Sequence, residues 1–260
     1  MAEVLVLDSK EAGAALVADH IARLVRERPT ATLGVATGST PLPVYQALGE
    51  HAASGTDFTG ASAFALDEYV GLPEGHPESY RAVVDTEVTR RLGLDPQRVH
   101  VPDGSVEGIE TAGARYEQAL TQHGGVDIQL LGIGSTGHLG FNEPGSSFAS
   151  LTRVKTLTEQ TRRDNARFFD SLDDVPMHCV TQGLGTILRA RHLVLLAFGE
   201  GKAEAIAAAV EGPVSASMPG SAIQLHPRVT VVLDPAAAAG LAHRDYYQWA
   251  QDHKPAWQGI

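Results

Sequence analysis

The sequence predicts an α/β protein: a doubly wound, Rossmann-like, mostly parallel sheet with helices on both faces. Two observations lead to this fold class. Short apolar runs rich in β-branched residues alternate along the chain with longer segments of helical period. Several of the short runs are continuously apolar, for example Leu193-Val194-Leu195-Leu196, as is typical of parallel strands covered on both faces.

The elements follow from these two patterns in chain order. The expected strands are Val4–Leu7, Thr32–Ala36, Ser62–Leu66, Ile128–Leu131, Arg153–Leu157, His192–Phe198 and Val229–Leu233. The expected helices are Glu11–Glu27, Pro41–Leu48, Val106–His123, Gln160–Leu172 and Lys202–Val210. No linker, repeat or change of composition divides the chain, so we expect one domain over residues 1–260. Ligands of such sheets bind beyond the carboxyl ends of the strands, so function is expected in the loops found there.

The composition excludes several classes of function. The 31 acidic and 20 basic residues give a formal net charge of -11, which argues against non-specific binding to nucleic acid or to an anionic membrane surface. The one cysteine, Cys179, leaves no internal disulfide and fits a reducing compartment. The N-terminus lacks the profile of a signal peptide and no apolar run reaches membrane-spanning length, so we expect a cytoplasmic protein.

The loop after the second expected strand has the composition of a phosphate cradle. Gly38 permits close approach of the backbone, and Ser39 and Thr40 offer hydroxyls beside the free N–H groups of a helix start. Thr40 is expected to cap that helix, with Pro41 in its first turn. Taken alone, the loop fits an ordinary capped turn between strand and helix better.

Two adjacent acids, Asp67 and Glu68, follow the third expected strand. A carboxylate at the carboxyl end of a strand can reach into a cleft and act as a general base. Taken alone, the pair is better explained as solvated charges or as an acid that caps a helix.

The most informative segment is the glycine-rich loop over residues 132–148. Three of its glycines have the spacing of a dinucleotide-binding fingerprint. We reject that interpretation because Gly140 and Pro144 arrive too soon for a crossover helix, and no acid follows at the required distance. His138 can shuttle protons near neutral pH, with Glu143 as the carboxylate that tunes it. No His-Glu-x-x-His or cysteine–histidine cluster accompanies them, so no metal site is expected.

Two cations complete the candidate site. Lys202 stands at the start of an expected helix, where the helix dipole disfavours a cation unless an anion shares the site. Arg167 is a candidate for bidentate phosphate binding. A solvated lysine at a frayed helix end and an arginine on an exposed helix face are the alternatives.

Together these segments resemble the glucosamine-6-phosphate deaminase/isomerase family from the Thr37 loop to about Leu233. The most specific matches are Leu66-Asp67-Glu68-Tyr69-Val70-Gly71-Leu72, His76-Pro77-Glu78-Ser79-Tyr80, Gly137-His138 and Phe141-Asn142-Glu143-Pro144-Gly145-Ser146-Ser147. Lys155-Thr156-Leu157-Thr158 and Val210-Glu211-Gly212-Pro213 match as well.

The resemblance implies that glucosamine 6-phosphate and water give fructose 6-phosphate and ammonia, without a metal or organic cofactor. Asp67 would move a proton between C2 and C1 of the sugar, and His138, oriented by Glu143, would open the ring. The implied phosphate ligands are Ser39, Thr40, Arg167 and Lys202, with Gly38 in the same loop.

One position departs from the family pattern, because some relatives carry an aspartate where this chain has Thr136. A hydroxyl can hydrogen-bond the imidazole but cannot stabilise an imidazolium by charge, so we expect slower or differently pH-dependent ring opening. Some relatives are hexamers activated by N-acetylglucosamine 6-phosphate. The residues that match their effector site are Ser146, Ser147, Arg153 and Lys155, although the last two fit solvated cations on a strand edge as well. Both the allostery and the homo-oligomer are open at this point.

Three other functions compete with this one. A 6-phosphogluconolactonase shares the fold and a histidine loop, but it lacks the Asn142-Glu143-Pro144-Gly145 and Asp67-Glu68-Tyr69 segments. A deaminase or isomerase for a related sugar such as galactosamine 6-phosphate is harder to exclude, because epimers differ by one hydroxyl. A non-catalytic sugar-phosphate sensor has no need of the acids or of His138, and Thr136 is its only support.

Overall fold

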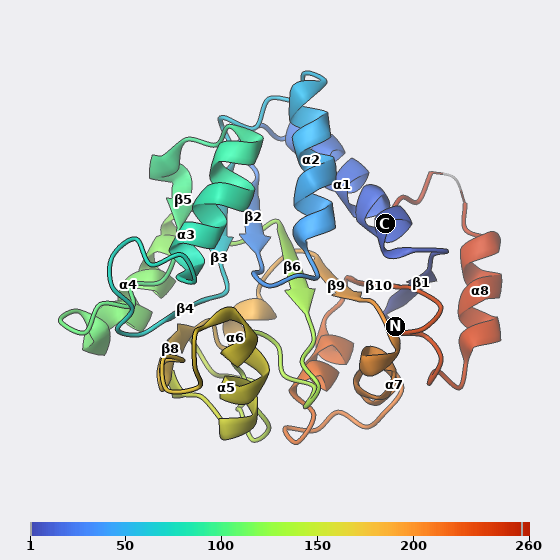
Figure 1. Cartoon of the computed structure of the whole chain (residues 1–260). Coiled ribbons are helices and arrows are strands. Elements are labelled where there is room, and N and C mark those ends of the chain that lie inside the picture. The colour runs from blue at the N-terminus through green and yellow to red at the C-terminus, as the bar shows by residue number, and fades with distance from the viewer. Residues whose placement is uncertain (1, 256) are drawn as a thin grey trace.

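The computed structural model describes residues 2–255 and 257–260, and there the central sheet is parallel with helices on both faces (Figure 1). The predicted fold class is thereby confirmed. The strands of this sheet run in the spatial order β1-β10-β9-β6-β2-β3-β5. They are β1 (Glu3–Val6), β2 (Thr32–Val35), β3 (Ser62–Ala65), β5 (Val99–His100), β6 (Ile128–Gly132), β9 (Leu193–Ala197) and β10 (Val229–Leu233).

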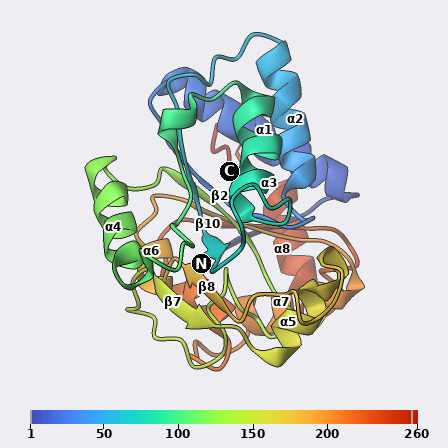
Figure 2. The same cartoon turned by 60° about the vertical axis from the view of Figure 1, so that its left-hand side comes forward.

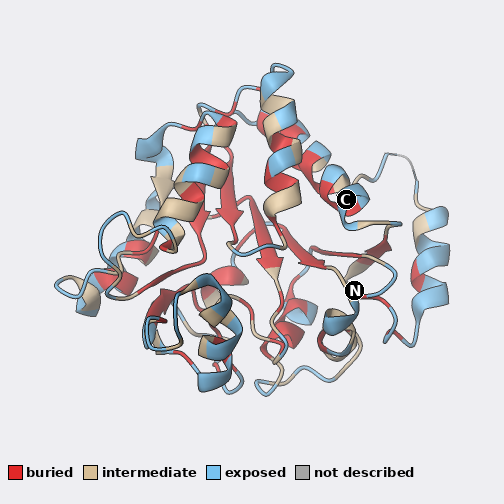
Figure 3. Cartoon of the chain, viewed as in Figure 1, coloured by how far each residue is buried: buried red, intermediate tan, exposed pale blue. Residues whose placement is uncertain are grey.

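Alternate residues of the strands bury the two faces of the sheet. Leu130 and Val194 pack in one hydrophobic cluster, and their neighbours Leu131 and Leu195 pack in the other, because successive side chains of a strand point to opposite sides. The first cluster includes residues of α1 (Lys10–Glu27) and α2 (Leu42–Ala53), and the second includes residues of α4 (Ile109–Gln122) and α7 (Ala203–Val210). The strands are therefore buried, while the outer surfaces of the helices are exposed (Figure 3).

A second, antiparallel sheet lies below the first, beside α5 (Figure 2). Its strands are β4 (Asp67–Tyr69), β8 (His178–Thr181) and β7 (Arg153–Thr156), in that spatial order. The strand predicted at Arg153–Leu157 forms, but it belongs here rather than to the parallel sheet. Its side chains alternate between half-buried and exposed, as expected of an edge strand with one solvated face.

Several helix boundaries differ from the prediction. The helix predicted over Gln160–Leu172 is wrong beyond Phe168: α5 (Glu159–Asn165) passes into a 3-10 turn, Ala166–Phe168, and Phe169 is extended. The helix expected from Val106 begins only after its N-cap, Gly108. A 3-10 turn, Glu200–Lys202, precedes α7. The sequence analysis missed β4, β5, β8, α3 (Tyr80–Val84), the π-helix Asp85–Arg90, the 3-10 turns Pro96–Arg98 and Pro219–Leu225, α6 (Leu184–Ile187) and α8 (Arg244–Asp252).

The strand order reverses between β2 and β6. From β2 the chain builds outward through β3 and β5, and it then returns to β6 on the other side of β2. Ligands of such sheets bind at this reversal, beyond the carboxyl ends of the strands. The loops over residues 36–41 and 133–145 leave β2 and β6 at this point. Among the described residues, no helix is both long enough and apolar enough to span a membrane.

Candidate active site

A hydroxyl links the histidine and the glutamate of the glycine-rich loop. Thr136 Oγ1 lies 2.8 Å from His138 Nδ1 and donates to Glu143 Oε2 at 3.1 Å. The direct separation of His138 Nδ1 and Glu143 Oε2 is 3.6 Å, which is too long for a hydrogen bond. Since the single hydrogen of Thr136 goes to Glu143, the hydroxyl accepts from Nδ1–H, and the neutral ring keeps its lone pair on Nε2.

The glutamate is buried and held from a second side by α5. Thr158 Oγ1 donates to Glu143 Oε1 at 3.3 Å, and Thr161 donates to the same oxygen. Burial alone would raise the pKa of Glu143, but its interaction with the nearby His138 and hydrogen bonds from Thr161 and Thr136 lower it to about 2. The carboxylate is therefore ionised at neutral pH.

The glycines of this loop make room for the histidine. The His138 ring lies over Gly134, where an added Cβ would come within 2.0 Å of the ring. Gly137 has a φ of 78°, and a Cβ there would collide with Met218. No helix forms between β6 and β7, in residues that are all described, so the crossover helix that a dinucleotide-binding fingerprint requires does not follow this loop.

The carboxyl of Asp67 lies against the same loop. Asp67 is 4% exposed, and its Oδ2 would be 3.2 Å from a Cβ added to Gly140, two residues after His138. Burial, helped by the neighbouring charge of Glu68, raises the pKa of Asp67 to about 8. Asp67 thus lies against the loop that carries His138, and the joint catalytic role of the two residues stays a prediction.

Glu68 has a structural role instead. Its carboxylate accepts hydrogen bonds from the backbone N–H groups of Tyr69, Tyr80 and Arg81, and so holds the start of α3. The explanation as a helix-capping acid is correct for Glu68 and wrong for Asp67.

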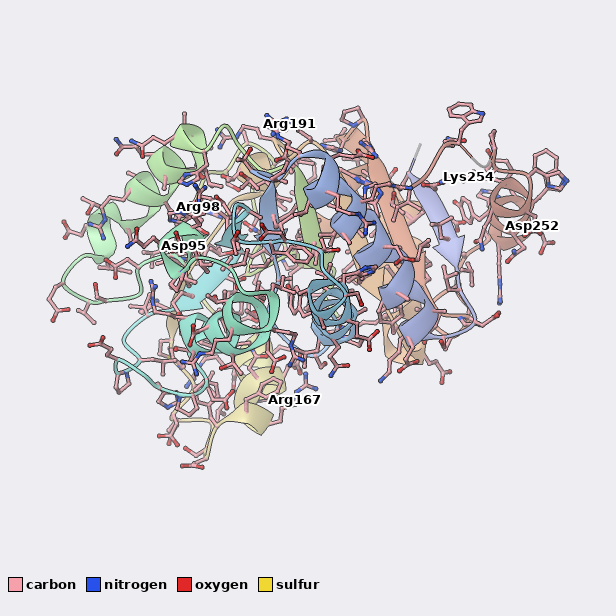
Figure 4. The ribbon with its side chains drawn as sticks, turned by 90° about the horizontal axis from the view of Figure 1, so that it is seen from above. Asp95, Arg98, Arg167, Arg191, Asp252 and Lys254 are labelled. Atoms are coloured by element: carbon pink, nitrogen blue, oxygen red, sulfur yellow. The ribbon has the colours of Figure 1, made fainter. Side chains whose placement is uncertain are left out.

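The two candidate cations approach one another. Lys202 Nζ donates to the carbonyl oxygen of Ile133 at 2.7 Å, directly beyond β6. Burial and the charge of Arg167 lower the pKa of Lys202. Arg167 lies over the ring of Phe168, 4.7 Å from its centroid, and Figure 4 shows it at the edge of the molecule where the chain leaves α5.

The loop after β2 is open, but one of its predicted roles is wrong. Gly38 has a φ of 84°, a conformation that favours glycine, and a Cβ there would meet nothing. Thr40 does not cap α2, because the N-cap is Pro41 and no side chain caps that helix. Thr40 and Ser39 therefore stand in the loop between β2 and α2 with no part in the helix cap.

The four candidate effector residues do not form one cluster by direct contact. Arg153 Nη1 donates to Asn142 Oδ1 at 2.7 Å, so Arg153 is not a solvated cation. Lys155 is half-buried on β7. Ser146 is buried and its hydroxyl has no hydrogen-bond partner among the described residues, whereas Ser147 Oγ accepts from the N–H of Ala149.

Sequence reasoning missed the residues that hold the loop from outside. Thr158 and Thr161 bind Glu143, Asn142 Nδ2 donates to the carbonyl oxygen of Gln182 at 2.7 Å, and Thr181 Oγ1 accepts from the N–H of Phe141 at 3.1 Å. The sequence signal at this point is Thr158 before a helix start, which indicates an N-cap but does not indicate the contact with Glu143. No group of three or more potential metal ligands occurs in the described part of the chain.

The fold and these groups define the class of protein: an α/β protein with titratable side chains gathered at the switch point of a parallel sheet. The chain belongs to the glucosamine-6-phosphate isomerase/6-phosphogluconolactonase family, whose model it matches over residues 8–232. It is 56% identical over 258 residues to a protein of Pseudarthrobacter chlorophenolicus named glucosamine-6-phosphate deaminase, covering 99% of this chain and 100% of that one. A Streptomyces coelicolor protein of the same name is 58% identical over 260 residues, with the same coverage.

Solved structures agree with this family. A monomeric glucosamine-6-phosphate deaminase, described as a missing link of the NagB superfamily, has a TM-score of 0.89 at 41% identity, over 92% of this chain and 99% of that one. The 6-phosphogluconolactonase of Leishmania guyanensis has a TM-score of 0.73 at 21% identity, over 93% and 99% of the two chains, and shares the fold.

Proposed function

We propose that this chain converts glucosamine 6-phosphate and water to fructose 6-phosphate and ammonia. The observation that carries the proposal is the buried Asp67 carboxyl beside a loop in which Thr136 joins His138 to Glu143. Full-length relatives at 56% and 58% identity, both named glucosamine-6-phosphate deaminase, support the same activity.

His138 opens the sugar ring in this proposal. Its Nε2 lone pair takes the proton of the O1 hydroxyl and returns it to O5 as the C1–O5 bond breaks, which leaves an open-chain aldehyde. The imidazolium that forms between these transfers is stabilised by the ionised Glu143 through the Thr136 hydroxyl.

Asp67 then performs the isomerisation. It removes the proton from C2, and the C1–C2 double bond forms as O1 takes up a proton that the substrate ammonium gives up. The return of the first proton to C1 then leaves an iminium at C2. Water adds to C2 and ammonia leaves, which gives the ketone of fructose 6-phosphate. The base must be ionised, and the ammonium of the substrate favours the ionised form of a carboxyl whose pKa burial has raised to about 8.

The phosphate is bound away from the reacting carbons. Lys202 and Arg167 supply charge, and Gly38, Ser39 and Thr40 supply backbone donors and hydroxyls at the adjacent strand end. Binding energy from this remote group positions C1 and C2 for proton transfer.

The test is the amount of ammonia and fructose 6-phosphate formed from glucosamine 6-phosphate, with galactosamine 6-phosphate as a parallel substrate. We expect one ammonia per fructose 6-phosphate from the first substrate and little product from the second. Product from the galactosamine epimer alone would assign the enzyme to that sugar. Binding of both sugars without product would assign a sensor.

Three expectations stay predictions. They are the cytoplasmic location, a homo-oligomer and the effector role of Ser146, Ser147, Arg153 and Lys155. The solved relative at 41% identity is described as monomeric, so relatives of this kind can work without subunit contacts.

A further inference from the structure

A cleft of about 130 Å³ lies at the end of the sheet opposite the candidate active site. Its lining includes His20, Arg23 and Glu27 of α1, Asp127 next to the start of β6, His192 next to the start of β9 and Arg228 next to the start of β10. Parallel strands begin at one edge of a sheet and end at the other, so this cleft and the candidate active site occupy opposite edges. Figure 4 shows the same separation: Arg191, which binds Asp127, lies across the molecule from Arg167. The volume is several times what one water needs.

Positive charge dominates the rim of the cleft. Arg23 Nη2 lies 3.1 Å from His20 Nδ1, and Arg228 Nη2 donates to the main-chain oxygen of Ile260 at 2.9 Å. Neither arginine forms an ion pair with an aspartate or glutamate side chain in the described part of the chain. Each guanidinium has five N–H donors, so most of them are available to a ligand.

The acids that line the cleft do not cancel this charge. Asp127 accepts from Arg28 at 2.6 Å, from Arg191 at 2.8 Å and from the N–H of Thr32 at 2.8 Å, so its carboxylate is fully engaged. Glu27 is exposed at the end of α1 and offsets one of the two rim arginines.

The wall of the cleft contains a buried histidine with an unused nitrogen. His192 is 2% exposed, and its Nε2 lies 2.9 Å from Thr230 Oγ1. Thr230 donates to Glu3 at 3.4 Å, so it accepts from Nε2–H, and Nδ1 of His192 carries the lone pair. This Nδ1 has no hydrogen-bond partner among the described residues. Buried polar atoms rarely lack a partner, so this nitrogen has the capacity to bind a ligand group.

We propose that this cleft binds a phosphate group, either free or as a monoester, with Arg23 and Arg228 as the charged donors and His192 Nδ1 as the group that meets a phosphate oxygen. A monohydrogen phosphate has the O–H that the neutral ring requires. Once the ring has taken up a proton, Nδ1–H donates to an ionised phosphate oxygen instead.

The pKa of the neighbouring His20 responds to such an anion. His20 packs edge-on against His192, with ring centroids 5.3 Å apart. Burial and the charges of Arg23, Arg228 and Lys254 lower the pKa of His20 to about 4. The pKa of His192 is lowered to about 3 by burial and by the charges of Arg228, His20, His226 and Lys254. The other charged groups near the two rings are Glu3, Glu27 and Asp127. An anion offsets the repulsion between cations, so its binding raises both pKa values and draws in protons.

The test measures binding of inorganic phosphate to the full chain by calorimetry. The background is the double variant Arg167→Ala, Lys202→Ala, because the candidate active site also offers phosphate ligands. We expect one remaining site in this background. Adding Arg23→Ala or Arg228→Ala weakens it by about tenfold or more, since each removes a charge-assisted donor. Arg26→Ala is the matched control: it removes an exposed arginine of the same helix that does not line the cleft, and it leaves binding unchanged.

A second readout is specific to the cleft and independent of activity. At pH 6 the C2 proton resonance of His20 moves downfield with phosphate and not with chloride at equal ionic strength. Glycerol 3-phosphate is compared with inorganic phosphate: tighter binding of the ester assigns a phosphorylated metabolite, and tighter binding of phosphate assigns the free anion. The proposal is wrong if the double variant binds neither, if Arg23→Ala and Arg228→Ala leave binding unaltered, or if the His20 resonance does not move.

Discussion

The hydroxyl of Thr136 lies 2.8 Å from Nδ1 of His138, at the position where some relatives carry an aspartate. The negative charge is one hydrogen bond further away, on Glu143, which accepts from the same hydroxyl at 3.1 Å. The hydroxyl therefore fixes the tautomer of the ring and relays the charge that an aspartate would supply directly.

Replacing Thr136 by valine removes this relay while keeping the shape of the side chain. Nδ1–H of His138 then lacks its partner, because Glu143 is 3.6 Å away. An unpaired buried donor costs about 1–3 kcal/mol, so we expect kcat to fall roughly tenfold to a hundredfold. Steady-state kinetics of Thr136→Val, with Thr136→Ser as the control that keeps the hydroxyl, measure this loss. Equal rates for both variants would exclude a role for the hydroxyl.

Thr161 of α5 donates a hydrogen bond to Glu143 of the glycine-rich loop. Thr161→Val removes a donor that lowers the pKa of this carboxyl, so we expect the acidic limb of the pH–rate profile to move to higher pH and kcat to fall. Thr121→Val, on the exposed face of α4, is the matched control and should leave the profile unchanged. Coincident profiles for the two variants would show that α5 does not tune the loop.

Lys202 is proposed to bind the phosphate rather than to take part in proton transfer. Lys202→Met should therefore raise KM at least tenfold with a much smaller effect on kcat, because binding that is equal in ground and transition states is lost. Competitive inhibition by inorganic phosphate should weaken in parallel. A fall in kcat with an unchanged KM would contradict a binding role.

Asp67 makes the stability of the protein depend on pH with a definite sign. The pKa of Asp67 is about 8 in the folded chain against an ordinary 3.8, so the folded state binds more protons between these values. The stability due to this group is complete below about pH 4 and is lost as the pH rises through 8. Between pH 5.5 and 8.5, wild type should lose free energy of unfolding relative to Asp67→Asn. Urea unfolding at the two pH values measures the difference, and parallel curves for the two proteins would place the pKa elsewhere.

The central sheet could be predicted because its signal is local. Continuous apolar runs such as Leu193–Ala197 need both faces covered, and only a buried parallel strand offers that. The antiparallel sheet could not be predicted, since β4 is three residues long and consists of Asp67, Glu68 and Tyr69, a polar run that becomes a strand only by pairing with β8. Tertiary pairing overrides β-propensity there.

Some residues of the candidate site could likewise be predicted from the sequence and others could not. Residue types and spacing pointed to His138 and Glu143, because titratable side chains in a glycine-rich loop stand out in a sequence. Asp67 received its role only from the family resemblance. The roles of Thr158 and Thr161 could not be read, since threonine at a helix start has the same appearance whether or not its hydroxyl reaches a carboxylate 15 or 18 residues away. Which acid of the Asp67–Glu68 pair faces the loop also depended on the position of α3.

The central claim is that Asp67 is the base of an aldose–ketose isomerisation at this site. The most direct measurement compares wild type with Asp67→Asn, following ammonia release from glucosamine 6-phosphate and, by calorimetry, binding of the same sugar. The account predicts that the variant binds the sugar within a few-fold of wild type while turnover falls below about a thousandth, since an amide cannot accept the C2 proton. Ammonia release by Asp67→Asn at a rate near that of wild type would contradict the account.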